Sequence, residues 1–93
     1  MAIEVRNDED CSCYELWLDG EVIGVAEYQV NGSQVIIPHT EIRPDLRGQG
    51  YGEQLVRGAL EQVRDSGRRV VPRCWFVHDF IEHHQEFADL RAN

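Results

Sequence analysis

The 93-residue chain contains no lysine, and its nine basic residues are all arginines. It has only three cysteines, and no apolar run approaches the length of a membrane-spanning helix. Cys11 and Cys13 stand too close in sequence to bridge comfortably, so we expect reduced thiols rather than a disulfide framework. The first residues, MAIEVRNDED, lack the charge and the apolar stretch of a secretory signal. These absences predict a cytoplasmic protein that does not enter a membrane.

The length predicts one domain spanning residues 1–93, with a single hydrophobic core. Residues 1–42 carry nine acidic side chains and one arginine, whereas residues 43–93 carry eight charges of each sign. The net charge of −8 therefore belongs to the first part of the chain. This acidic part either attracts a cationic substrate or only keeps the protein soluble. Without a basic stripe or an aromatic platform, the sequence does not favour a nucleic-acid partner.

Apolar periodicity and turn signals predict the secondary structure. Strands are expected at residues 2–6, 14–18, 21–30, 34–42 and 70–77, and helices at residues 52–66 and 78–90. Asp19-Gly20 and Asn31-Gly32 are hairpin signals, which makes the first four strands an antiparallel meander. The expected order is ββββαβα. The side chains expected in the core include Trp17, Trp75, Phe76 and Phe80.

The strand at 34–42 and the strand at 70–77 are joined by a helix, so we expect them to lie parallel through a right-handed crossover. Pro38 and Pro72 fall within these two strands, and proline removes a donor from the hydrogen-bond ladder. We therefore expect the two strands to splay apart near the prolines. The predicted fold class is α/β (α+β): a mixed sheet with an antiparallel N-terminal meander and a parallel, splayed fourth and fifth strand.

Three glycines at alternate positions, Gly48, Gly50 and Gly52, precede the first predicted helix. Alternating glycines expose successive N–H groups, and the positive end of the helix adds to them, so this loop should bind an anion. The dinucleotide fingerprint fails, because Glu53 or Leu55 stands where its third glycine is required. A P-loop also fails, since the chain has no lysine. The loop predicts a phosphate site of another kind.

The loop sequence Arg47-Gly48-Gln49-Gly50-Tyr51-Gly52 fits the pattern R-x-x-G-x-G. It resembles the pyrophosphate-binding motif of the GNAT superfamily, the acetyl-CoA-dependent N-acetyltransferases. The segments HTEIRPDLRGQGYGEQLV and VVPRCWFVHDFIEHHQEFADL resemble a group of very small GNAT proteins that lack the usual N-terminal helices. The resemblance implies a GNAT-like fold with acetyl-CoA as co-substrate.

The resemblance also implies how the co-substrate is held. The amides of residues 47–52 would bind the pyrophosphate, and Ile42 and its neighbours would offer backbone groups to the pantetheine. Arg43 and Arg47 would add positive charge near the phosphates. The acyl acceptor does not follow from the resemblance.

GNAT enzymes generally remove a proton from an amine, which then attacks the thioester directly. His39 and Glu41 are candidate bases, because residues two apart on a strand share a face unless a bulge intervenes. Histidine side chains titrate near neutral pH, whereas Glu41 would need burial to act as a base and could instead attract an ammonium group. His39 could equally be a packed strand histidine.

Cys74 lies on the predicted strand that would flank the thioester. It could form an acetyl-cysteine intermediate or merely line the pantetheine channel. Phe87 stands where GNAT enzymes often place a tyrosine that protonates the departing thiolate, and phenylalanine cannot give a proton. Another group, such as Cys74, a histidine or water, would then supply that proton, or the protein is a poor catalyst.

Two functions follow from these residues. The first is an N-acetyltransferase that acts on a primary amine, either a small amine or a lysine-bearing acceptor, which the acidic part of the chain predicts to be cationic. The second is a module that binds acetyl-CoA or CoA without efficient turnover, in a sensing or interaction role. No metal site is expected, because neighbouring His83 and His84 diverge on a helix and C-x-C lacks the spacing of structural zinc sites.

Overall fold

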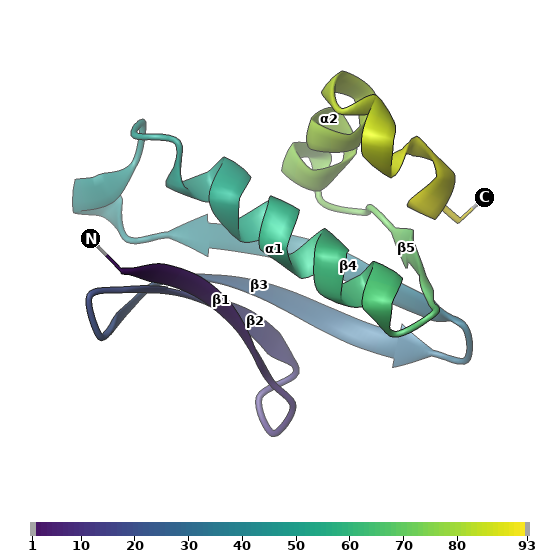
Figure 1. Cartoon of the computed structure of the whole chain (residues 1–93), viewed down its shortest axis with the longest axis horizontal. Helices are drawn as coiled ribbons and strands as arrows, with labels where there is room; N and C mark the ends of the chain where they lie inside the picture. Colours follow the sequence, from purple (N-terminus) through teal and green to yellow (C-terminus); the bar gives the residue numbers. More distant parts are fainter. Residues whose placement is uncertain (1, 93) are drawn as a thin grey trace.

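A computed structural model describes residues 2–92, and its strands form one mixed sheet in the order β1-β2-β3-β4-β5 (Figure 1). The strands are β1 (Ile3–Asp8), β2 (Cys13–Leu18), β3 (Glu21–Asn31), β4 (Gln34–Ile42) and β5 (Arg69–Val71). The helices are α1 (Tyr51–Asp65) and α2 (Trp75–His83), with two 3₁₀ segments, η1 (Pro44–Leu46) and η2 (Gln85–Leu90). Strands β1 to β4 pair antiparallel and β5 pairs parallel to β4. The predicted order and meander are confirmed.

Helix α1 covers one face of this sheet (Figure 1). The side chains that it buries recur every three or four positions: Leu55, Val56, Ala59, Leu60 and Val63. They join a single core with buried residues of β2, β3 and β4 and with the apolar side of α2. No helix in residues 2–92 is both long enough and apolar enough to cross a membrane.

Strands β4 and β5 pair over only three residues, Gln34–Ile36 with Arg69–Val71. Pro38 and Pro72 follow this short ladder, and neither has an N–H to extend it. The N–H of Cys74 donates to the carbonyl of Ile37 at 2.9 Å, just where the two segments part. The expected splay is therefore present.

A bulge in β4 decides which of its side chains face α1. Glu27 pairs with His39, but Gln29 pairs with Ile36, so β4 holds one more residue than β3 over this stretch. Such a bulge turns the following side chains to the opposite faces. Thr40 consequently shares the α1 side with buried Ile37, while His39 lies on the other face.

The predicted strand at 70–77 is wrong beyond Val71, and the predicted helix at 78–90 begins too late and ends too late. The chain leaves the sheet at Pro72, and α2 starts at Trp75 and ends at His83. Once the segment has separated from β4 it has no partner for a ladder, and its apolar residues pack with helical spacing instead. Trp75 is 76% exposed, so its expected place in the core is also wrong, whereas Phe80 is buried.

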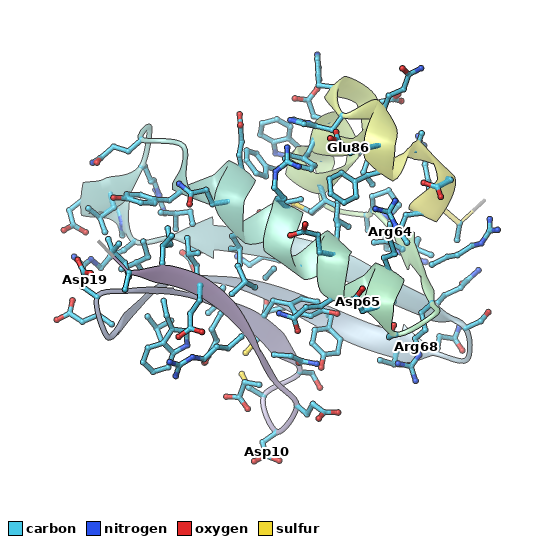
Figure 2. All side chains as sticks on the ribbon, in the orientation of Figure 1. Asp10, Asp19, Arg64, Asp65, Arg68 and Glu86 are labelled. Atoms are coloured by element: carbon cyan, nitrogen blue, oxygen red, sulfur yellow. The ribbon has the colours of Figure 1, made fainter. Side chains whose placement is uncertain are left out.

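Segment η2 is bound to the end of α1 through Arg64, whose side chain extends from α1 toward Glu86 (Figure 2). Its guanidinium donates to the carbonyl of Glu86 at 2.6 Å and to the carboxylate of Asp89 at 3.0 Å. Beneath it Phe87 is buried and lies 5.7 Å from the ring of Phe80, measured between centroids. The C-terminal end of the chain thus completes the core.

Candidate active site

The loop between β4 and α1 has the geometry expected of an anion site. Gly48 and Gly50 adopt positive φ angles of 80° and 85°, which only glycine takes up without strain. Gly50 is the N-cap of α1, and the first helical hydrogen bond runs from the N–H of Gln54 to its carbonyl. The amides of residues 51–53 therefore precede the helical ladder and are free to face a ligand. The positive end of α1 lies at the same place.

A cavity of about 830 Å³ extends from this loop into the gap between β4 and the segment that follows β5. Its wall contains eight of the ten predicted site residues: His39, Ile42, Arg47, Gly48, Gly50, Tyr51, Gly52 and Cys74. Gln49 and Glu41 do not line it. Among the lining residues, Thr40, Tyr51 and Cys74 carry a hydroxyl or a thiol. The fold thus brings the glycine loop and the predicted thiol to one cavity.

Glu41 lies beside the cavity rather than in it. One carboxylate oxygen is 3.9 Å from Nε2 of His39, and the other is 3.8 Å from Nη2 of Arg47. Nε of Arg47 donates to the carbonyl of Ile42 at 3.0 Å, which holds the arginine over the end of β4. The Glu41 side chain is 57% exposed, so it lacks the burial that a glutamate base requires.

Arg43 does not line the cavity either. Its Nε donates to Oδ1 of Asp45 at 2.8 Å, and its Nη1 donates to Oε2 of Glu21 at 3.3 Å. The hydrogen bond from Arg43 also lowers the pKa of Asp45. Arg47, and not Arg43, is therefore the arginine of this loop that can add charge to the cavity.

Cys74 caps the N-terminus of α2, because the chain leaves the sheet before reaching it. Its Sγ lies 3.5 Å from Oγ1 of Thr40 across the splay. Burial acts to raise the pKa of the Cys74 thiol, but the Thr40 hydroxyl and the backbone amides of Val77, Phe76 and Thr40 together outweigh it. The net effect is a pKa below that of an ordinary cysteine, as is typical of thiols at helix N-termini.

Thr40 lines the cavity beside Cys74, and the sequence did not reveal it. Thr40 lies two residues after Pro38. In a strand without a bulge, its side chain would have pointed away from Cys74. The bulge brings it to the cavity. Phe87, in contrast, lies in the core and outside the cavity wall. The position expected for a tyrosine acid is therefore a packing position in this chain.

A second group of potential ligand atoms lies at the turn between β1 and β2, whose tip is marked by Asp10 in Figure 2. Within residues 2–92, a carboxylate oxygen of Asp8 and the sulfur atoms of Cys11 and Cys13 lie within 4.8 Å of one another. His83 and His84 do not take part in it; each ring nitrogen Nδ1 instead faces a carbonyl of its own helix. Both cysteines are free thiols.

The comparison with protein families agrees with this geometry. A family model described as GCN5-related N-acetyl-transferase matches residues 13–90. That range contains four of the five strands, the glycine loop, both helices and Cys74. Among curated proteins, no sequence matches the chain.

Solved structures share the fold at low sequence identity. The solution structure of a GCN5-like protein from Staphylococcus aureus is 21% identical, with a TM-score of 0.71, over 97% of this chain and 88% of that one. A GNAT-family acetyltransferase from Brucella melitensis, in complex with acetyl-CoA, is 21% identical with a TM-score of 0.58, over 73% of this chain. An acetyltransferase from Bacillus subtilis, in complex with CoA, is 21% identical with a TM-score of 0.57, over 90% of this chain. This chain spans only 50% and 62% of the last two proteins.

Proposed function

Because the chain belongs to the GCN5-related N-acetyltransferase family, we propose that it transfers the acetyl group of acetyl-CoA to a primary amine. The observation that carries this proposal is the single cavity that joins the glycine loop to Cys74. The amides of Arg47, Gly48, Gln49, Gly50, Tyr51 and Gly52 would bind the pyrophosphate. The complexes of two relatives with acetyl-CoA and CoA support this assignment.

The pantetheine arm would lie in the gap between β4 and the segment after β5. Residues 40–42 have no partner strand on that side, because β5 ends at Val71. Apart from the Ile42 carbonyl, which accepts the hydrogen bond from Nε of Arg47, their backbone groups on that side are therefore available to an extended ligand. Ile42 would offer such groups near the loop, and the acetyl thioester would reach Thr40 and Cys74 at the other end of the cavity.

In direct transfer, His39 would take a proton from the acceptor amine, whose nitrogen then attacks the carbonyl carbon of the acetyl group. The carbon–sulfur bond breaks, and CoA leaves as a thiolate. His39 suits this role because its side chain is 55% exposed on the outer face and it also lines the cavity. Cys74, with its lowered pKa, would return a proton to the CoA thiolate, a task that Phe87 cannot perform.

A covalent route uses the same residues differently. The Cys74 thiolate would attack the acetyl carbon and expel the CoA thiolate, and the amine would then attack acetyl-Cys74. The lowered pKa of Cys74 supports this route as well as the direct one. Glu41 would not be the base in either route. Instead, it would hold Arg47 and attract the ammonium form of the acceptor.

A thiol-release assay with acetyl-CoA and a panel of primary amines tests the function. We expect release above the spontaneous rate, and a loss of roughly 10²-fold in His39→Ala if His39 is the base. If Cys74 is an obligatory nucleophile, acetyl-CoA alone should add one acetyl group that hydroxylamine removes, and Cys74→Ala should lose both adduct and turnover. Cys11→Ala, an exposed thiol outside the cavity, is the matched control.

Binding without turnover is the alternative outcome. If CoA binds but no amine accelerates thiol release, the chain is a binding module and the catalytic assignment is wrong. An active Cys74→Ala variant, with no acetyl adduct on the parent protein, would exclude the covalent route and leave direct attack.

A further inference from the structure

The turn between β1 and β2 brings two thiols and a carboxylate together, away from the cavity. A carboxylate oxygen of Asp8 and the sulfur atoms of Cys11 and Cys13 lie within 4.8 Å of one another, and we call these three side chains the turn cluster. Within residues 2–92, no other histidine, cysteine, aspartate or glutamate side chains form such a group. None of the three lines the cavity that holds Cys74, so the proposed acetyl transfer does not account for them.

The backbone of the turn holds the two sulfur atoms near each other. Ser12, which stands between the two cysteines, has a φ of 56°, a left-handed conformation that is uncommon for a residue other than glycine. Alternate residues of an extended strand stand about 6.6 Å apart, whereas these sulfur atoms lie within 4.8 Å. The carbonyl of Ser12 accepts a hydrogen bond from the N–H of Tyr28 at 2.9 Å, so β3 holds the turn in this conformation. The turn cluster is therefore formed before any ion binds.

Cys13 is buried, but not by core packing. Its side chain is 2% exposed, yet alone among the buried apolar side chains of residues 2–92 it does not join the hydrophobic core. The next residue, Tyr14, does belong to that core, and successive side chains of a strand point to opposite faces. Cys13 therefore points away from α1. Its sulfur is sheltered from water at a place where the packing of the core does not require a thiol, and this sheltering favours coordination to an ion.

Asp8 reaches the two thiols from the facing strand, because the register pairs it with Cys13. One of its oxygens, Oδ1, accepts a hydrogen bond from the N–H of Cys11 at 3.3 Å. A carboxylate has about four lone-pair positions, so this one bond leaves others for an ion. Hydrogen bonds of this kind orient the ligands of metal sites. The spacing C-x-C did not predict this arrangement, since the third ligand atom comes from the end of β1.

The donor atoms of the turn cluster suit a thiophilic cation. Ligand atoms on one tetrahedral zinc ion stand about 3.5–3.8 Å apart, as follows from zinc–sulfur bonds of about 2.3 Å and zinc–oxygen bonds of about 2.0–2.2 Å. Each pair in the cluster therefore has to close by at most about 1.3 Å, which a side-chain rotation provides. Thiolates select zinc-like ions, whereas magnesium and calcium prefer oxygen. Residues 8–13 also carry three carboxylates and no basic side chain, which attracts a cation.

We propose that the turn cluster binds one divalent thiophilic cation of the zinc type, through Sγ of Cys11, Sγ of Cys13 and a carboxylate oxygen of Asp8, with water in the fourth position. Each thiol releases its proton to water as its sulfur binds the ion. Cys11 is exposed and provides the path of entry. The ion joins the last residue of β1 to the first residue of β2 and so stabilises the edge of the sheet. This inference does not depend on acetyl transfer.

The test is a titration with Cd²⁺, a zinc-like ion whose bonds to thiolates absorb in the ultraviolet, in a reductant that contains no thiol. We expect one Cd²⁺ per chain, displaced by Zn²⁺ but not by excess Mg²⁺. Cys11→Ser should lose the absorbance, and it is the decisive variant because this exposed side chain lies outside the core. Asp8→Asn retains an oxygen for the N–H of Cys11 but has an amide nitrogen in place of its second oxygen. Its affinity for Cd²⁺ should fall at least about tenfold.

Two variants serve as controls. Cys74→Ala removes the thiol of the cavity, and Asp10→Asn removes a carboxylate at the tip of the same turn (Figure 2); both should bind Cd²⁺ as the parent protein does. Zn²⁺ should raise the melting temperature of the parent protein but not that of Cys11→Ser. Absorbance that persists in Cys11→Ser, absorbance that is lost in Cys74→Ala, or displacement of Cd²⁺ by Mg²⁺ would overturn the proposal. Unchanged affinity in Asp8→Asn would overturn the assignment of Asp8 as a ligand.

Discussion

Gly50 is the position at which the phosphate site can be tested with least damage to the fold. Its φ is 85°, and no atom lies within 4 Å of a Cβ built on it, so a side chain fits but adopts a left-handed conformation. Asp and Asn tolerate this conformation better than other residues, at a cost of about 1 kcal/mol. Gly50→Asp and Gly50→Asn therefore differ mainly in one negative charge.

The expected difference in CoA affinity between the two variants follows from Coulomb's law. A carboxylate about 4 Å from a phosphate charge raises the free energy of binding by ~1 kcal/mol in bulk water and by ~4 kcal/mol in the surroundings of a protein surface. We therefore expect Gly50→Asp to weaken CoA binding by roughly fivefold to a thousandfold relative to Gly50→Asn. Added salt should narrow the difference, because it screens exposed charges.

Isothermal titration calorimetry at low salt measures the affinity of the parent protein and of both variants for CoA. Circular dichroism melting verifies that each variant folds. Equal losses in both variants would mean that bulk, and not charge, is responsible. If both variants bind CoA as tightly as the parent protein, the phosphates do not lie at Gly50 and the placement of the cofactor is wrong.

Three further predictions follow from other contacts. Iodoacetamide should alkylate Cys74 much faster than Cys13 at pH 7.5, since the pKa of Cys74 is lowered and that of Cys13 is raised to about 12. Thr40→Val should shift the pH–rate profile for alkylation of Cys74 to higher pH, because the thiolate loses a hydrogen-bond donor. An unshifted profile would refute the role of Thr40 as that donor. Gly58→Ala should lower the melting temperature, because its Cβ would collide with Cγ2 of Val5. The overpacking should cost about 1–3 kcal/mol, partly offset by the better helix propensity of alanine. Val5→Ala should reduce the free energy of unfolding less in the Gly58→Ala variant than in the parent protein. If the effects of the two substitutions simply add, the two residues do not collide. Raising salt should increase the KM for a cationic acceptor but not for a neutral one, and equal responses would remove electrostatic attraction as the explanation.

The glycine loop and α1 could be predicted because their signals are local. Glycines at Gly48 and Gly50 mark positive φ angles, and the apolar spacing of α1 marks its buried face. The splay was also predictable, since Pro38 and Pro72 each remove a ladder donor wherever they lie in the strands. These features do not depend on distant contacts.

The position of Cys74 in the cavity was predicted, but its place at the N-terminus of a helix beside Thr40 was not, because that depends on tertiary pairing. The run Val70–Val77 has strand-like residues, but a strand needs a partner, and pairing with β4 ends at Val71, after which the chain leaves the sheet at Pro72. Cys74 therefore became a helix cap, which changes its pKa. Thr40 was missed for a related reason: the bulge that turns it toward Cys74 is defined by the register with β3.

The most direct test of the central claim is an amide NMR titration of the labelled protein with acetyl-CoA. We predict the largest shift changes at the amides of Gly48, Gly50 and Gly52, together with Thr40 on β4 and the amides that surround Cys74, because these groups line one cavity. The turn between β1 and β2 should change little. Changes confined to that turn, or no change at a saturating concentration, would contradict the assignment of this cavity to acetyl-CoA.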